Sequence, residues 1–183
     1  MKARASAILA GLFLTFSPLF LFSQSEKSFP ESWLGNWTGE LEIYGPRGVM
    51  QTFPMALNIQ ATDTAGIFTW EIIYGEGEKR DVRPYVLKIV DAEKGHYQVD
   101  EKNSIILDSY WLGEILVDIF SVNNALLVTT AELVEDDVLL WQIISGNLDA
   151  TSVTGGEMVE GEDIPEVVSY LGPRMQRARL KRQ

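Results

Sequence analysis

Residues 33–44 read Trp-Leu-Gly-Asn-Trp-Thr-Gly-Glu-Leu-Glu-Ile-Tyr, and this stretch decides the fold. From residue 37 onward, polar side chains alternate with apolar or small ones at Trp37, Gly39, Leu41 and Ile43. A period of two is typical of a strand that buries one face and exposes the other. Because the turn-forming sequence Gly-Pro-Arg-Gly follows at 45–48, we expect a half-buried strand over 37–44.

The same pattern repeats outward from this strand along the chain. Further strands are expected over 53–61, 67–74, 83–90, 96–99, 105–107, 114–122, 125–133 and 138–145, separated by turns rich in Gly, Asn and acidic residues. After residue 25, no segment shows a helical period over eleven or more residues. The sequence therefore predicts an all-β domain over 26–183, an antiparallel meander of eight to ten strands.

Closure of this sheet is the physically favoured outcome, because an open sheet of so many twisted strands leaves two exposed edges. The chain end offers a closing strand, since Gln176, Ala178 and Leu180 alternate with Arg177, Arg179 and Lys181. Paired with the first strand, these cations would neutralise Glu40 and Glu42. We thus expect an up-and-down β-barrel, with 157–173 as an acidic loop and 174–183 as a basic closing strand or, equally, a solvated tail.

The run Gly35-Asn36-Trp37 resembles the Gly-x-Trp signature of the lipocalins and the wider calycin superfamily. The resemblance implies a barrel with a ligand cavity or an occluded remnant of one, and structural roles for Gly35 and Trp37, with the Trp plugging one barrel end. The chain departs from that family in lacking a clear Thr-Asp-x-x-Tyr motif. The late Arg that caps the Trp in lipocalins would have to be Arg174 or Arg177.

Sites for chemistry are few. A nitrobindin-type haem barrel also begins with such a Gly-x-Trp run, but it needs a late axial His, and the single His96 lies in mid-chain. A Ser-His-Asp site would also need His96, which follows Gly95 in an expected turn. The acidic clusters lack the spacing of a calcium loop. We therefore expect no catalytic residues, no metal and no cofactor, and a protein that is not an enzyme.

Composition narrows the partners. The chain of 183 residues has 15 Lys and Arg against 26 Asp and Glu, and no Cys. Disulfides and thiolate chemistry are excluded, and nucleic acid is excluded as a partner because an acidic body repels phosphates. Residues 115–122 and 138–144 are apolar on both faces, so the termini or a second subunit should cover part of them. A homo-oligomer is one way to do so.

The N-terminus resembles an export signal. Lys2 and Arg4 precede the apolar run 5–22, which ends in Ser23-Gln24-Ser25. This order of basic, apolar and small residues is typical of a secretory signal peptide over 1–25. An uncleaved anchor is the alternative, and Pro18 favours cleavage. We therefore expect a periplasmic or secreted protein with no membrane span after cleavage.

Aromatic residues are the best indication of function. Six fall on faces that could point into a barrel: Trp70, Tyr74, Tyr85, Trp111, Phe120 and Trp141. Such side chains line apolar ligand cavities and also fill cores. The sequence predicts an exported, non-enzymatic protein that holds a small hydrophobic ligand in its barrel. The alternative is a structural or partner-binding module whose barrel is filled.

Overall fold

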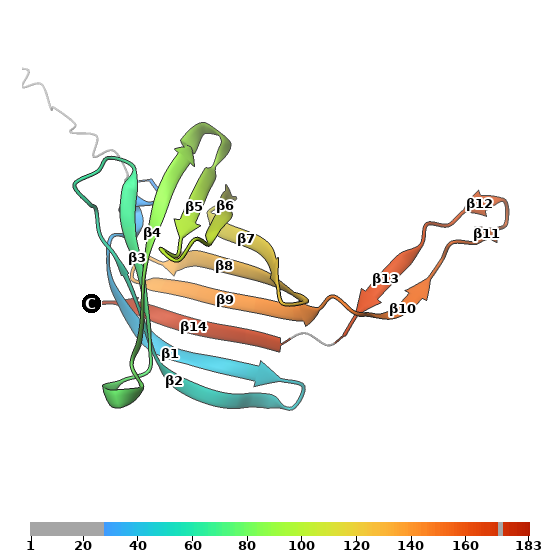
Figure 1. Cartoon of the computed structure of the whole chain (residues 1–183), viewed down its shortest axis with the longest axis horizontal. Helices are drawn as coiled ribbons and strands as arrows, with labels where there is room; N and C mark the ends of the chain where they lie inside the picture. The colour runs from blue at the N-terminus through green and yellow to red at the C-terminus, as the bar shows by residue number, and fades with distance from the viewer. Residues whose placement is uncertain (1–27, 172–173) are drawn as a thin grey trace, which may run out of the picture.

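The computed structural model describes residues 28–171 and 174–183, and ten of their strands close into one antiparallel barrel (Figure 1). The first nine follow one another as a meander: β1 (Gly35–Gly45), β2 (Gly48–Ile59), β3 (Ile67–Tyr74), β4 (Asp81–Asp91), β5 (His96–Asp100), β6 (Ile106–Leu112), β7 (Ile115–Val122), β8 (Ala125–Glu135) and β9 (Val138–Asn147). The last, β14 (Arg174–Arg182), lies between β9 and β1. The predicted all-β, up-and-down barrel is confirmed.

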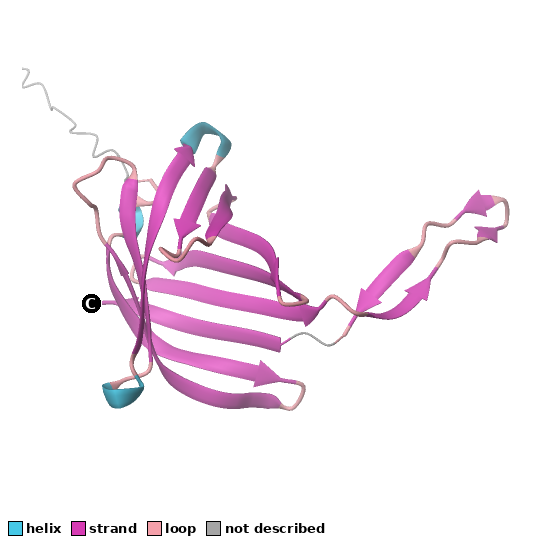
Figure 2. Cartoon of the chain, viewed as in Figure 1, coloured by secondary structure: helices cyan, strands magenta, loops and turns pink. Residues whose placement is uncertain are grey.

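Within residues 28–171 and 174–183, helix is limited to three short 3-10 turns (Figure 2). They are η1 (Glu31–Trp33), η2 (Gly77–Lys79) and η3 (Ala92–Lys94). None of the helices in the described part of the chain is long and apolar enough to cross a membrane. The predicted signal peptide over 1–25 lies outside the described residues.

The barrel closes through β14 in the register that charge alternation predicted. Glu40 lies opposite Arg179, and Glu42 lies opposite Arg177. The expected neutralisation of Glu40 and Glu42 does not follow from this register. Arg179 instead forms an ion pair with Glu135 at 3.0 Å, and Arg177 Nε donates to Gln142 Oε1 at 2.9 Å. The reason is that β14 has two neighbours, and these long side chains reach to the β9 side.

Gly39 allows β1 and β14 to approach closely. A Cβ atom at this position would lie 2.2 Å from the carbonyl oxygen of Arg179. Any side chain would therefore push the closing strand away, and a glycine inside a strand has here a packing reason. Gly39 therefore lets the barrel close, in addition to occupying an inward-facing position of β1.

Inward positions of the strands form the core. Most of its members are apolar side chains that alternate along the strands, joined by Phe29 and Trp33 from the segment before β1, and the most buried are Trp33, Trp37, Leu41, Leu57, Ile59, Leu87, Leu139 and Leu180. The outer positions of β7 and β9 remain open within the described chain: Ile119 is 66% exposed and Ile144 is 46% exposed. The expected cover from the termini is therefore not provided by the described residues.

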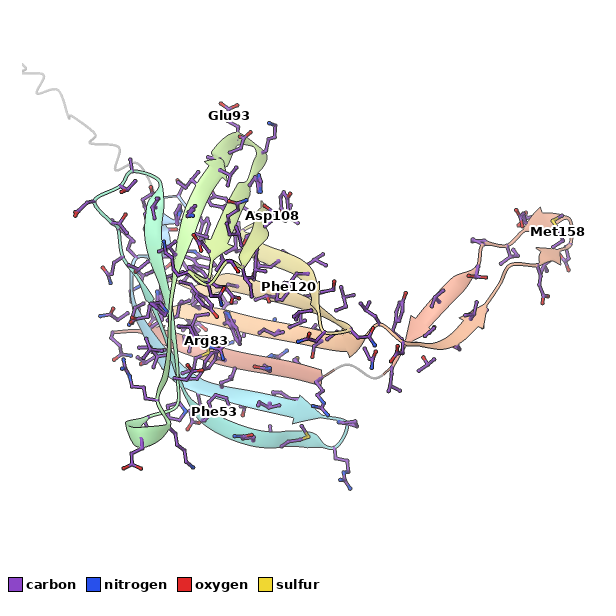
Figure 3. The ribbon with its side chains drawn as sticks, in the orientation of Figure 1. Phe53, Arg83, Glu93, Asp108, Phe120 and Met158 are labelled. Carbon is purple, nitrogen blue, oxygen red and sulfur yellow. The ribbon has the colours of Figure 1, made fainter. Side chains whose placement is uncertain are left out.

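An arm projects from the barrel between β9 and β14 (Figure 1). It consists of β10 (Ala150–Thr154) paired with β13 (Val167–Tyr170), and of β11 (Met158–Val159) paired with β12 (Glu162–Asp163). Met158 lies at its far end (Figure 3). The stretch 157–173, which we expected to be an acidic loop, thus contains three strands in its described part. β-branched residues pair in its inner ladder, Val153 with Val168 and Thr154 with Val167, and the acidic Glu162 and Asp163 pair with Val159 and Met158 at its tip.

Candidate functional site

One end of the barrel is filled by aromatic side chains. Trp37 is fully buried, and its indole Nε1 donates to the carbonyl oxygen of Trp33 at 2.9 Å. Trp33 belongs to η1, the turn that precedes the first strand, and is itself buried. The bond satisfies the polar atom of a buried indole, as burial requires. Trp37 therefore has a structural place at this end.

Residues ahead of the first strand complete this packed end. The ring of Phe29 stacks on that of Trp111, with ring centroids 4.4 Å apart, and meets Tyr97 edge to face at 4.9 Å. Trp33 adds an edge contact to Trp111 at 5.6 Å. We missed Phe29 and Trp33 in the sequence because neither lies in an alternating run. Two aromatic residues just before a Gly-x-Trp turn were the available signal.

Arg182 covers Trp37 from the other side. Its guanidinium carbon lies 4.3 Å from the centroid of the Trp37 ring, and its nitrogens donate to the carbonyls of Leu34 at 2.8 Å and Ser32 at 2.9 Å. The expectation that Arg174 or Arg177 would cap the Trp is wrong. Because β14 runs antiparallel to β1, its last residues reach Trp37, whose cross-strand partner is Arg182.

Gly35 makes room for this cap. Its φ is +148°, and a Cβ atom there would lie 3.4 Å from Arg182 Cγ. Side chains rarely adopt this backbone conformation, which glycine adopts readily. The Gly-x-Trp run therefore combines a turn that needs glycine with an indole held between Trp33 and Arg182.

Beyond the packed end, the barrel encloses a cavity of about 230 Å³. Most of its wall is apolar, and residues from β3 to β9 line it: Trp70, Ile72, Tyr74, Arg83, Tyr85, Val99, Glu101, Leu107, Leu116, Asp118, Phe120, Leu127, Thr129, Ala131, Trp141 and Ile143. Figure 3 labels Arg83 and Phe120 from two of these strands. Five of the six aromatic residues expected at a ligand site are therefore brought together: Trp70, Tyr74, Tyr85, Phe120 and Trp141.

Trp111 is the sixth, and the structure places it elsewhere. Its ring packs against Phe29 and Trp33 and borders a separate outer hollow of about 730 Å³ near Arg182. The prediction that Trp111 lines the same cavity is therefore wrong. The expectation that it points inward is correct, but it lies at the level of the barrel that the N-terminal segment fills.

Asp118 is the exceptional residue of the cavity. It is only 8% exposed, it points inward on β7, and burial raises the pKa of its carboxyl group to about 6. Ser109, its cross-strand neighbour on β6, acts in the opposite direction on that pKa. The sequence analysis missed Asp118, although a single acid inside the apolar run 115–122 was a visible signal.

Other polar groups of the cavity belong to β3, β4 and the end of β5. The Arg83 guanidinium lies 5.3 Å from the Tyr74 ring centroid and pairs with Asp81 at 3.0 Å. Burial raises the pKa of Tyr74 to about 12. Tyr74 therefore stays neutral and Arg83 stays charged under physiological conditions. Glu101 also lines the cavity.

The single histidine lies outside this cavity. His96 Nε2 is 2.8 Å from Asp108 Oδ1 on β6, and its ring stacks on Tyr110. Hydrogen bonds from Gln98 and His96 lower the pKa of Asp108. Ser109 follows Asp108 but points to the opposite face, into the barrel, because side chains alternate along a strand. No metal-binding group of three or more His, Cys, Asp or Glu occurs among residues 28–171 and 174–183.

Comparisons with known proteins identify the fold. No family model matches the sequence, and no curated protein matches it. A solved structure of a protein of unknown function from the DUF3598 family of Nostoc punctiforme is similar, with TM-score 0.55 and 15% identity over 84% of this chain. The match covers 48% of that protein, so this chain spans about half its length. An S-type phycobiliprotein lyase from Guillardia theta is similar with TM-score 0.50 and 10% identity, covering 84% of this chain and 89% of the lyase.

The second likeness corrects one expectation. We expected that a barrel without a recognisable acid-base or metal site would not be an enzyme. A protein named a lyase has this fold, so that expectation is contradicted. The physical reason is that catalysis also arises from binding and orienting a substrate, without a nucleophile or a metal. The likeness itself, at 10% identity, shows the shared barrel.

Proposed function

We propose that this protein binds a small, largely apolar molecule inside its barrel. The observation that carries the proposal is the cavity of about 230 Å³, walled by five aromatic side chains on facing strands. Pockets for drug-sized ligands are typically apolar clefts of about 300–1,000 Å³ with a few polar groups. The smaller volume favours a compact ligand of one or two rings.

Toluene is a suitable first probe, because apolar cavities of about 150 Å³ bind molecules such as benzene. A ligand that binds only the folded state raises the thermal unfolding midpoint. We expect toluene to raise this midpoint, because it would bind between the aromatic side chains that line the cavity.

Two neighbouring threonines on β8 supply matched variants. Thr129 lines the cavity, whereas Thr130 points to the other face. Thr129→Phe should fill the cavity and remove the response to toluene, and Thr130→Phe should keep it. Absence of a response in the parent protein would contradict the proposal and support a filled barrel that binds partners on its outer surface.

We propose in addition that the protein acts outside the cytoplasm, after cleavage following Ser23 or Ser25. The basic, apolar and small-residue regions support this. Cleavage at either position would retain Phe29, whose ring packs against Trp111 at the filled end. Terminal sequencing of the protein from a cell fraction is the test, and a species that retains Met1 would contradict it.

A further inference from the structure

Asp118 has an unsatisfied hydrogen-bond acceptor inside the cavity. Its Oδ1 is buried and has no hydrogen-bond partner among the described residues, and the same holds for Oγ of Ser109, its cross-strand neighbour on β6. The residue lies on the inward face of β7, between Leu116 and Phe120, and all three line the cavity. Buried polar groups are normally hydrogen-bonded, and an unpaired one calls for an explanation.

The surroundings of Asp118 do not compensate its charge. Burial and the adjacent Ser109 hydroxyl are the causes that set its pKa, and no cation is among them. The one cation among the described residues of the cavity wall is Arg83, and this guanidinium donates to Asp81 at 3.0 Å and to the Tyr85 hydroxyl at 3.5 Å. A buried carboxylate without a cation is unfavourable. A ligand that brings a cation would therefore relieve it.

We propose that the ligand of this cavity is a compact aromatic or alicyclic amine whose protonated nitrogen donates to the Asp118 carboxylate. The inference rests on the proposed function, because it names the chemical class of the molecule held in the same cavity. The apolar body of the amine contacts Trp70, Phe120 and Trp141, which line the same cavity. Such aromatic faces also attract ammonium groups.

Binding of an amine should depend on pH through Asp118. The other charged or titratable groups of the cavity wall are Tyr74, Arg83, Tyr85 and Glu101. The pKa of each tyrosine is raised by burial, and that of Arg83 is raised chiefly by its hydrogen bond to Tyr85, so these three keep one state from pH 5 to pH 7.5. Asp118, with a pKa of about 6, is mostly protonated at pH 5 and mostly ionised at pH 7.5. Variants, described below, distinguish the effect of Asp118 from that of Glu101.

Three probes of similar size test the proposal in calorimetric titrations of the folded protein: benzylamine, benzyl alcohol and toluene. At pH 7.5 we expect benzylamine to bind about tenfold more tightly than either neutral probe, the size of a hydrogen bond to a charged group. At pH 5, where benzylamine is still protonated, its affinity should fall about tenfold, as the ionised fraction of Asp118 does. The affinity of toluene should not fall.

Two amidated variants assign the effect. Asp118→Asn keeps the shape of the side chain and should remove both the preference for benzylamine and its pH dependence. Asp108→Asn changes an exposed acid on the outer face of the neighbouring strand and should keep both. If Asp118→Asn does not fold, Glu101→Gln takes its place and should keep both the preference for benzylamine and its pH dependence, and loss of either would overturn the assignment to Asp118.

The outcomes are distinct. Toluene binding without a preference for benzylamine would overturn the amine assignment and leave the proposed function standing. A preference that survives in Asp118→Asn would also overturn it and point to Glu101. If none of the three probes binds, the proposed function itself fails.

Discussion

The filled end of the barrel and its cavity are both lined by aromatic side chains, yet they differ in how their buried polar atoms are bonded. At the filled end, the Trp37 indole donates to Trp33, and Arg182 donates to three backbone carbonyls, although its Nε has no partner within the described chain. In the cavity, neither Asp118 Oδ1 nor the neighbouring Ser109 Oγ has a partner among the described residues. The difference teaches that the chain itself holds the buried cation of the filled end with several acceptors, whereas the buried acid of the cavity has room for a donor from a bound molecule.

Of the variants that test this comparison, Trp37→Ala should have the largest effect on stability. Trp37→Ala deletes a fully buried indole and should lower the free energy of unfolding by about 3–5 kcal/mol. The control is Tyr110→Ala on the outer face, where 44% of the side chain is exposed and a change within about 0.5 kcal/mol is expected. Denaturant unfolding measures both, and equal losses would mean that the filled end is not the stabilising region.

Removal of the Arg182 side chain should cause the second-largest loss of stability. Arg182→Ala removes three hydrogen bonds from a cation to carbonyls and a cation–π contact, and should reduce stability by about 2–3 kcal/mol. Arg174, at the opposite end of β14, is exposed, and Arg174→Ala should change little. A similar loss in both variants would show that net charge, rather than the cap on Trp37, matters.

Asp118 should make the cavity region pH-sensitive. Its pKa is about 6 in the folded protein and 3.8 for the free group, so the folded state holds the proton more tightly. Stability from this group is therefore present at low pH and is lost as pH rises toward and through 6. Between pH 4.5 and pH 7.5, the free energy of unfolding should fall by about 2 kcal/mol relative to Asp118→Asn.

The measurement is the difference between the two proteins at each pH, because other carboxyl groups act in the opposite sense. The pKa values of Asp91, Asp100 and Asp108 are all lowered by hydrogen bonds. Those groups are common to both proteins and cancel in the difference. A flat difference across this range would show that Asp118 is solvated.

The outer wall should show the smallest effect. Arg179 and Glu135 form an ion pair at 3.0 Å with both side chains largely exposed. Arg179→Ala should change stability by less than about 1 kcal/mol, the range for exposed pairs. A loss similar to that of Arg182→Ala in the same unfolding assay would mean that outward charges hold the barrel closed, rather than selecting its register.

Trp111 and Trp141 show how much of the candidate site the sequence predicts. Both were expected to point inward, and they do. Alternation predicted the face of Trp141 in the expected strand 138–145, whereas Trp111 lies beyond the expected strand 105–107, because β6 continues to Leu112. Alternation could not predict the level of either residue along the barrel axis, because level depends on the stagger between strands, which no single strand encodes. Trp141 therefore lines the cavity while Trp111 packs on Phe29.

Two further differences have related causes. The Arg over Trp37 was placed wrongly because the direction and length of β14 set which of its cations reaches β1. Asp118 was overlooked because the run 115–122 is apolar on both faces, so the sequence does not indicate whether its single acid points into the barrel or outward. The capping arginine and the inward acid can both be placed once neighbouring strands are aligned, because each is then compared with the inward-facing residues of the adjacent strands.

The closing strand also bears on how the chain is made. β1 pairs with β2 on one side, but its other partner is β14, and every other strand of the barrel lies between these two in the sequence. During synthesis from the N-terminus, β1 therefore presents an unpaired edge until all the other strands have been made. Such long-range pairing is intrinsically slow. Until β14 has been added the nascent chain is an open sheet, and this one strand converts it into a container.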